Sequence, residues 1–222
     1  MKINLLVIFL FTSLLLNAQI KKGALFIGGD VSVYGSKYKG TDPANQVTSQ
    51  NNGFNFSPSL GWVVKDNVIV GGRLMASFDN SKNQPLTYSA KANRIGAGIF
   101  MRKYLPLGKS FYLFGDGGLN AQTNYSKQVQ SPPMQQSVYT IQKGLAITVT
   151  VFPGLSYQVK KSLFIEAALN NLISLGYVRN NTEQSNQNGN IFKGVNNSYN
   201  LSSSLGNGVP LQLGMRWMFA KR

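Results

Sequence analysis

Apolar and polar residues alternate along most of the chain after residue 20. Successive side chains of a strand point to opposite faces, so this alternation predicts strands with one apolar face. The clearest segment runs from residue 142 to 159, where Leu145, Ile147, Val149 and Val151 alternate with small or polar residues. Turn signals divide the chain into eight such segments. The predicted strands are Gly23–Tyr34, Gly53–Val64, Val68–Asp79, Ala90–Tyr104, Ser110–Thr123, Gln142–Val159, Leu163–Val178 and Pro210–Phe219.

The connections between these segments are alternately short and long. Tight turns are predicted at residues 65–67, 106–109 and 160–162, and polar loops separate the other strands. The longest loop, Arg179 to Ser198, is rich in Asn and lacks apolar periodicity, so we expect it to be irregular and mobile. Antiparallel strands joined in this way place both termini at the end of the tight turns.

The last predicted strand has the most aromatic apolar face. Leu211, Leu213, Met215, Trp217 and Phe219 share that face, and the same phase extends back to Tyr199, where the strand could begin. Asn207-Gly208 could form a hairpin turn, but we expect a bulge or kink within one long strand. Pro58 and Pro153 lie inside strands, and each needs a bulge or a local break because proline has no donor for the ladder.

The ending PLQLGMRWMF and the turn-loop alternation resemble the small eight-stranded outer-membrane barrels of the OmpA and OmpX type, and more generally the outer membrane protein β-barrel families of Gram-negative bacteria. One departure is that three residues follow Phe219. The resemblance implies an all-β, eight-stranded antiparallel up-and-down transmembrane β-barrel, inserted by the outer-membrane insertion machinery. It implies no particular activity. A soluble exported β-sandwich is the alternative fold.

The first residues have a different pattern. Lys2 precedes an apolar run from Ile3 to Leu16, and Asn17-Ala18 supplies a small residue suited to cleavage. This pattern predicts a signal peptide over residues 1–18 and a barrel domain over residues 19–222.

Composition narrows the chemistry. The chain has no Cys and no His, so it lacks disulfides, thiolate metal sites and the commonest general base. We predict no cofactor and no metal. Lys and Arg number 22 against seven acids, for a net charge of +15. An exported chain of this charge meets anionic lipid and lipopolysaccharide, not nucleic acid, so these lipids are the expected partners.

Aromatic residues gather at both ends of the predicted apolar faces, as expected of side chains at the membrane interfaces. Near the tight turns lie Trp62, Phe111, Tyr157, Trp217 and Phe219, and near the long loops lie Phe54, Phe78 and Tyr177. Basic residues also concentrate at both ends. Those at the loop end suit lipopolysaccharide phosphates, although simple solvation of polar loops explains them equally well.

The opposite, inward faces carry a balanced set of charges. The predicted interior network comprises Asp30, Asp79, Asp116 and Glu166 with Arg73, Arg94, Arg102 and Arg216. Glu166 and Arg216 lie at similar depth on neighbouring strands, so we predict that they pair. Arg102 and Asp116 are expected in the same layer, and Asp79 with Arg94 closer to the loops. Such a network can fix the barrel as a plug or form a charged pore constriction.

Three functions are compatible with this interpretation. A non-enzymatic structural or surface-interaction scaffold is favoured, because side chains can just fill an eight-stranded interior. A narrow porin-like channel for ions or small solutes is the alternative. A lipid-modifying enzyme is the weakest, because the chain lacks a His base and has no close acid pair near the loop end.

Overall fold

The computed structural model describes residues 20–40, 48–84, 88–131, 137–169, 172–186, 188–203 and 211–219. The predicted signal peptide, Asn207-Gly208 and the last three residues lie outside these ranges. The strands are β1 (Leu25–Lys39), β2 (Thr48–Lys65), β3 (Val68–Gln84), β4 (Tyr88–Pro106), β5 (Phe111–Gln130), β6 (Val138–Lys160), β7 (Leu163–Leu169), β8 (Ile173–Asn186), β9 (Ile191–Ser203) and β10 (Leu211–Phe219). No helix among the described residues is long and apolar enough to cross a membrane.

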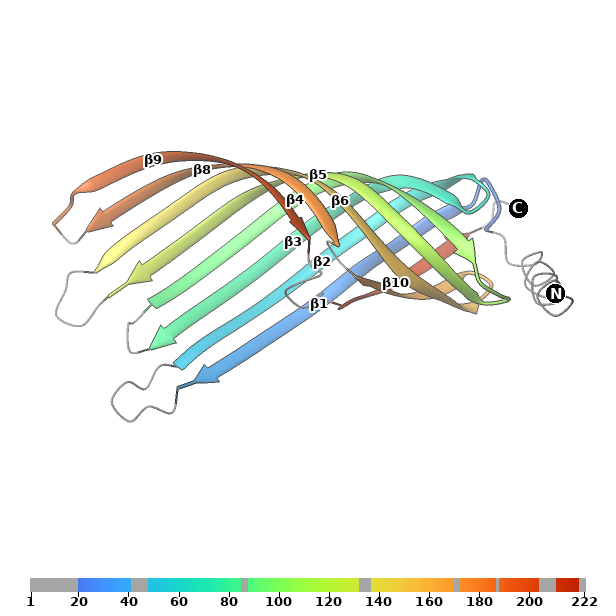
Figure 1. Cartoon of the computed structure of the whole chain (residues 1–222), viewed down its shortest axis with the longest axis horizontal. Coiled ribbons are helices and arrows are strands. Elements are labelled where there is room, and N and C mark those ends of the chain that lie inside the picture. The colour runs from blue at the N-terminus through green and yellow to red at the C-terminus, as the bar shows by residue number, and fades with distance from the viewer. Residues whose placement is uncertain are drawn as a thin grey trace, which may run out of the picture.

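Eight of these strands close a ring. Each of β1 to β6 pairs antiparallel with the next, β6 pairs with β7, β7 with β10, and β10 with β1. The fold is therefore an all-β, antiparallel up-and-down barrel, one sheet closed on itself and not two packed sheets. The start of β1 and the end of β10 lie side by side at the closed end of the barrel, near the tight turns (Figure 1). We call this the turn end and the opposite end the loop end.

The predicted seventh strand is interrupted. β7 pairs with β6 from Gly154 to Lys160, whereas β8 pairs with β6 from Val138 to Val151. Pro153 lies between these two stretches and is opposite Gly115 of β5. Pro153, whose backbone nitrogen cannot donate a hydrogen bond to a neighbouring strand, thus lies opposite the break between β7 and β8. Pro58 is accommodated similarly, because the pairing of β2 with β3 skips from Phe56 to Ser59.

The prediction of an irregular, mobile loop from Arg179 to Ser198 was wrong. β8 continues to Asn186 and pairs with β9 as a hairpin, with Ile173 opposite Ser203 and Ser185 opposite Ile191. The other polar connections also form strand, since β1 and β2 pair as far as Lys39 and Thr48, and β5 and β6 as far as Gln130 and Val138. Backbone pairing does not require an apolar face, which is why apolar periodicity understated the strand lengths.

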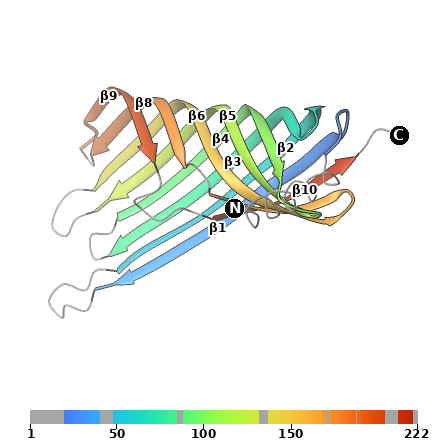
Figure 2. The same ribbon diagram turned by 45° about the vertical axis from the view of Figure 1, so that its right-hand side comes forward.

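The loop half of the barrel is not closed in the described part of the chain. β1 pairs with β10 only as far as Val31, and β9 has β8 as its one partner strand. The long strands therefore form an open trough, in which the β8–β9 hairpin and β1 are the two edges (Figure 2). The trough leads down to the closed ring at the turn end.

The tight turns hold the turn end together. Asn67 has a φ of 63°, a left-handed conformation that Asn adopts more readily than most residues. Its side-chain oxygen accepts a 2.9 Å hydrogen bond from the Ile20 backbone, and its carbonyl accepts one of 2.8 Å from the Tyr104 backbone. This turn thus joins Ile20, which precedes β1, to the turn end of β4.

Candidate functional site: the barrel interior

The interior begins at the turn end with a floor of aromatic side chains. Phe26, Tyr104, Tyr112, Phe114 and Phe164 are all almost fully buried. Tyr104 packs edge-on against Tyr112 with ring centroids 6.0 Å apart, and Tyr112 packs against Phe164 at 5.7 Å. These rings come from inward positions near the turn ends of β1, β4, β5 and β7. The floor fills the ring at this level.

A continuous chain of charged side chains lies on this floor. Its order is Asp30, Arg216, Glu166, Arg102, Asp116 and Arg73. Arg216 pairs with Asp30, and its Nε lies 3.2 Å from Glu166 Oε2. Arg102 donates to Glu166 and, over 2.8 Å, to Asp116. Arg73 completes the chain with a 2.5 Å bond to the other Asp116 oxygen. We call these six residues the ion chain.

Four of the six ion-chain residues, Arg216, Glu166, Arg102 and Asp116, are deeply buried, and the ion chain rests on aromatic faces. Arg216 is 1% exposed and Glu166 2%. The Arg102 guanidinium lies 4.3 Å from the Phe114 ring centroid, and that of Arg73 lies 4.6 Å from the Phe100 centroid. Glu166 has three cationic or hydroxyl partners, Asp116 has two and Asp30 has Arg216, so every carboxylate of the ion chain is compensated. The ion chain joins β1, β3, β4, β5, β7 and β10 across the lumen.

The two remaining predicted network residues form a separate group nearer the loop end. Arg94 pairs with Asp79 and donates a 3.2 Å hydrogen bond to Ser77. The Tyr34 hydroxyl also donates to Asp79. This group is more accessible than the ion chain, since the Arg94 side chain is 41% exposed.

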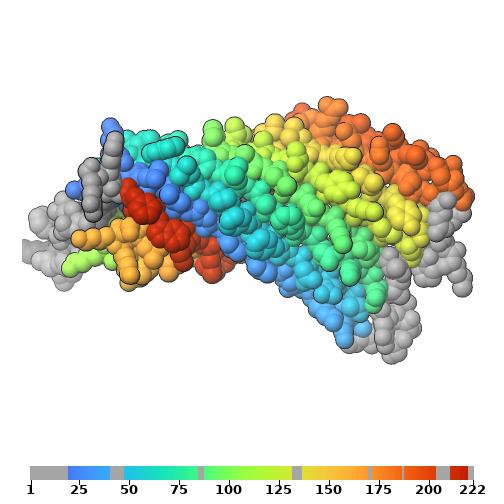
Figure 3. Space-filling view, turned by 180° about the vertical axis from the view of Figure 1, so that it is seen from behind, coloured from blue at the N-terminus to red at the C-terminus, as the bar shows by residue number. Residues whose placement is uncertain are grey.

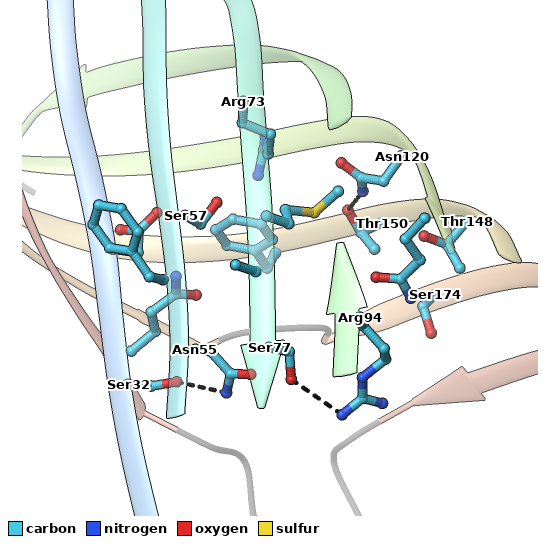
Figure 4. A pocket seen from close by; sticks show the side chains of 17 residues that line it. Ser32, Asn55, Ser57, Arg73, Ser77, Arg94, Asn120, Thr148, Thr150 and Ser174 are labelled. Carbon is cyan, nitrogen blue, oxygen red and sulfur yellow. Dashed lines mark hydrogen bonds between the residues drawn. The ribbon is translucent and has the colours of Figure 1, made fainter. Parts of the chain in front are cut away.

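Between the two groups lies a polar cavity of about 350 Å³, the cup. Its wall consists mainly of hydroxyl and amide side chains, among them Ser32, Asn55, Asn120 and Thr150 (Figure 4). Asn120 donates to Thr150 over 3.3 Å, and Asn55 donates to Ser32 over 2.9 Å. Arg73 and Asp30 reach the cup from the ion chain. The cup can hold water or a small polar molecule.

The structure brings together all eight predicted network residues, in two groups. From their depth along the strands we paired Glu166 with Arg216, placed Arg102 and Asp116 in one layer, and put Asp79 with Arg94 nearer the loops. The two residues of each pair are in contact in the structure. Sequence reasoning missed Tyr104, whose hydroxyl donates to Glu166 over 2.5 Å, and Tyr34. Tyr104 and Tyr34 occupy inward positions in the alternation of their strands. The alternation could therefore have identified them.

The predicted interface aromatics point outward. Phe54, Trp62, Phe78, Phe111, Tyr157, Trp217 and Phe219 are exposed by 39% to 56%. Tyr177 is partly covered, because its ring packs 5.1 Å from that of Tyr199 and its hydroxyl donates to Asn197. The apolar face of the closing strand is outward as well, with Leu211, Leu213 and Met215 exposed while Arg216 is buried.

Gly28 of β1 makes room for the ion chain. A Cβ at this position would collide with the Arg216 side chain and lie 2.9 Å from the Met215 carbonyl oxygen. We expect Gly28→Ala to destabilise the barrel by about 1–3 kcal/mol, because crowding of this size forces neighbours to shift. Gly29→Ala is the matched control, since its Cβ would meet its nearest atoms at an ordinary 3.5 Å. Denaturant unfolding of both variants tests this, and equal stabilities would contradict the crowding.

The chain was compared with protein families, curated proteins and solved structures. No protein-family model and no curated protein matches the chain. Among solved structures it is similar to a major outer membrane protein from Thermus thermophilus, with 9% identity, a TM-score of 0.49 and coverage of 91% of this chain and 100% of the other. The translocator domain of the autotransporter NalP from Neisseria meningitidis has 14% identity and a TM-score of 0.48, covering 90% and 69%. Neisserial surface protein A has 16% identity and a TM-score of 0.32, covering 89% and 100%.

Proposed function

We propose that this chain is an outer-membrane β-barrel of a Gram-negative bacterium, exported with residues 1–18 as its signal peptide, that serves as a non-enzymatic scaffold. Its role is to hold the long strand extensions and their loops at the cell surface. The observation that carries the proposal is the reversal of the usual burial pattern. Large apolar side chains of the ring point outward and are exposed, whereas charged side chains are buried inside. Lipid is the solvent in which that arrangement is stable.

The side chains that fill the interior of the ring favour a scaffold over a channel. The aromatic floor and the ion chain occupy the lumen at the turn end, and their side chains are at most a few per cent exposed, except Asp30 and Arg73, which border the cup. Eight strands enclose a space that side chains can just fill. The ion chain thus supports a plug that fixes the barrel.

A non-enzymatic role is supported by the side chains available. The chain has no His and no Cys. Within the described ranges, no group of three or more potential ligand side chains is arranged to hold a metal ion. The carboxylates of the ion chain are each paired with arginine inside the ring.

A narrow channel for ions or small solutes is the second candidate, and the cup is the observation that favours it. The cup has polar walls and reaches the ion chain from the loop end. A path through the turn end would require both the ion chain and the aromatic floor to rearrange.

Conductance across a planar bilayer separates the two candidates. The scaffold predicts that the inserted protein shows no conductance, because buried side chains of the floor and of the ion chain pack the ring at the turn end. Heat-modifiable migration on a gel, comparing boiled with unboiled protein recovered from the membrane, shows whether folded barrel is present during the recording. A steady single-channel step from folded protein would contradict the scaffold and favour the channel.

A further inference from the structure

Five basic residues of the loop half lie on the outward face of strands β3, β4, β5, β6 and β8. These residues are exposed and occupy the same alternate positions as the outward apolar residues of their strands, such as Phe78 on β3 and Ile95 on β4. They are Lys82, Lys91, Lys127, Lys143 and Arg179. The inward positions at the same level carry mainly Asn, Gln, Ser and Thr. We call these five residues the cation stripe. Their placement separates them from the interior of the barrel and directs them toward whatever surrounds it.

The cation stripe is continuous across neighbouring strands. Lys91 of β4 lies directly opposite Lys127 of β5. Lys143 opposes Tyr125, the outward residue two positions from Lys127, so Lys127 and Lys143 are diagonal neighbours. Lys82 is diagonal to Lys91 through Ser89, and Arg179 is diagonal to Lys143 through Leu145. Diagonal neighbours on one face lie about 7–8 Å apart, within reach of long side chains. The strands concerned adjoin one another on the surface seen in Figure 3.

The five stripe residues also stand at similar heights above the turn end. Counted along the strands from their turn-end residues, Val68 to Lys82 is 14 residues, Pro106 to Lys91 is 15, Phe111 to Lys127 is 16, Lys160 to Lys143 is 17 and Leu163 to Arg179 is 16. At about 3.3 Å per residue and a tilt of about 40°, about 15 residues rise about 38 Å. A bilayer with its headgroups is about 40–45 Å thick. The cations therefore stand at the level of the outer headgroups.

Acidic side chains do not neutralise the stripe. Glu183 on the outward face of β8 pairs with Lys193 at 3.4 Å, and the ion pairs of the described residues include none of the five stripe residues. Like charges directly opposite in a sheet are destabilising, as for Lys91 and Lys127. An anion shared between them removes that cost.

We propose that the cation stripe binds the phosphate groups of a phosphorylated lipid in the outer leaflet, with the Lys91–Lys127 pair at its centre. This inference rests on the proposed membrane location. A lipid is the occupant because the stripe continues the exposed apolar band below it, which acyl chains would cover while the phosphates meet the lysines. Lysine suits this role, since its ammonium contacts phosphate as a point charge from a flexible stem.

The test measures lipid retention by native mass spectrometry of the purified protein in neutral detergent. The probes are bisphosphorylated lipid A, the same lipid after removal of its phosphates, and inorganic phosphate as competitor. Lipid A is expected to bind at least about tenfold more tightly than its dephosphorylated form. The double variant Lys91→Gln/Lys127→Gln should weaken lipid A binding about 30-fold, which corresponds to about 1 kcal/mol for each lysine.

The double variant Lys65→Gln/Lys103→Gln is the matched control, because it removes the same charge from exposed lysines at the turn end. Its lipid A affinity should change less than about twofold. Equal losses in both double variants, no loss in either, or displacement of lipid A by equimolar inorganic phosphate would each overturn the proposal. Heat-modifiable migration is measured for every variant. Folded, membrane-inserted protein without phosphate selectivity refutes the stripe alone, whereas protein that never inserts refutes the proposed function.

Discussion

Replacing Arg216 with Met is expected to destabilise the folded barrel by about 3–5 kcal/mol, the range found when one partner of a buried ion pair is removed. Arg216 contacts two carboxylates, Asp30 and Glu166, from within the ion chain. Met keeps most of the side-chain length but leaves both acids with fewer partners in a site that is almost fully buried. Denaturant unfolding of the inserted protein, followed by the fluorescence of its two tryptophans, measures the loss.

Lys103→Met is the matched control for this prediction. It also replaces a long cationic side chain with Met, but Lys103 is exposed on the outward face of β4 and lies outside both the ion chain and the cation stripe. Its unfolding free energy should change by no more than about 0.5 kcal/mol, as for most surface substitutions. If Arg216→Met were as stable as Lys103→Met, the ion chain would contribute nothing to holding the ring.

The second large effect is expected at the outward face of β6. Val149→Arg should cost about 2–4 kcal/mol, because an arginine near the midplane of a barrel faces hydrocarbon. Val149 lies on the outward side, 45% exposed, between Leu119 of β5 and Leu175 of β8. Unfolding from lipid vesicles measures the cost, and folding yield into vesicles provides a second measurement.

Val195→Arg supplies the comparison. Val195 is also outward and is 60% exposed, but it belongs to the β8–β9 hairpin and is paired with Asn181, beyond the cation stripe. We expect a change within about 0.5 kcal/mol, because this arginine would remain in water. Equal costs at the two positions would show that Val149 does not meet lipid.

The inward and outward faces of each strand could be predicted from the sequence, because the alternation of side chains between two faces is a local property of a strand. Once Val149 and Trp217 are assigned outward, the inward positions of Glu166 and Arg216 follow from counting. Counting from the tight turns also gives relative depth. Depth and parity together were enough to propose that Glu166 and Arg216 are neighbours.

Features that depend on strand register could not be predicted in this way. Asp30 meets Arg216 across the junction of the first and last strands, where the stagger of the closed ring decides which residues face each other. The polar strand extensions escaped detection because their backbone pairing leaves no apolar periodicity. The interruption at Pro153 was anticipated as a break, but its alignment with the gap between β7 and β8 required the pairing of β6.

The ion chain also couples closure of the ring to the loss of water from its interior. Its partners come from β1, β3, β4, β5, β7 and β10, and Asp30 and Arg216 are separated by 186 residues. Without β10 in place, Asp30 lacks the Arg216 cation, and Glu166 keeps Arg102 as its one cation beside the Tyr104 hydroxyl. An open ring would therefore hold poorly compensated carboxylates that water solvates better than a dry interior does. Expulsion of water from the turn end and docking of β10 are expected to occur together.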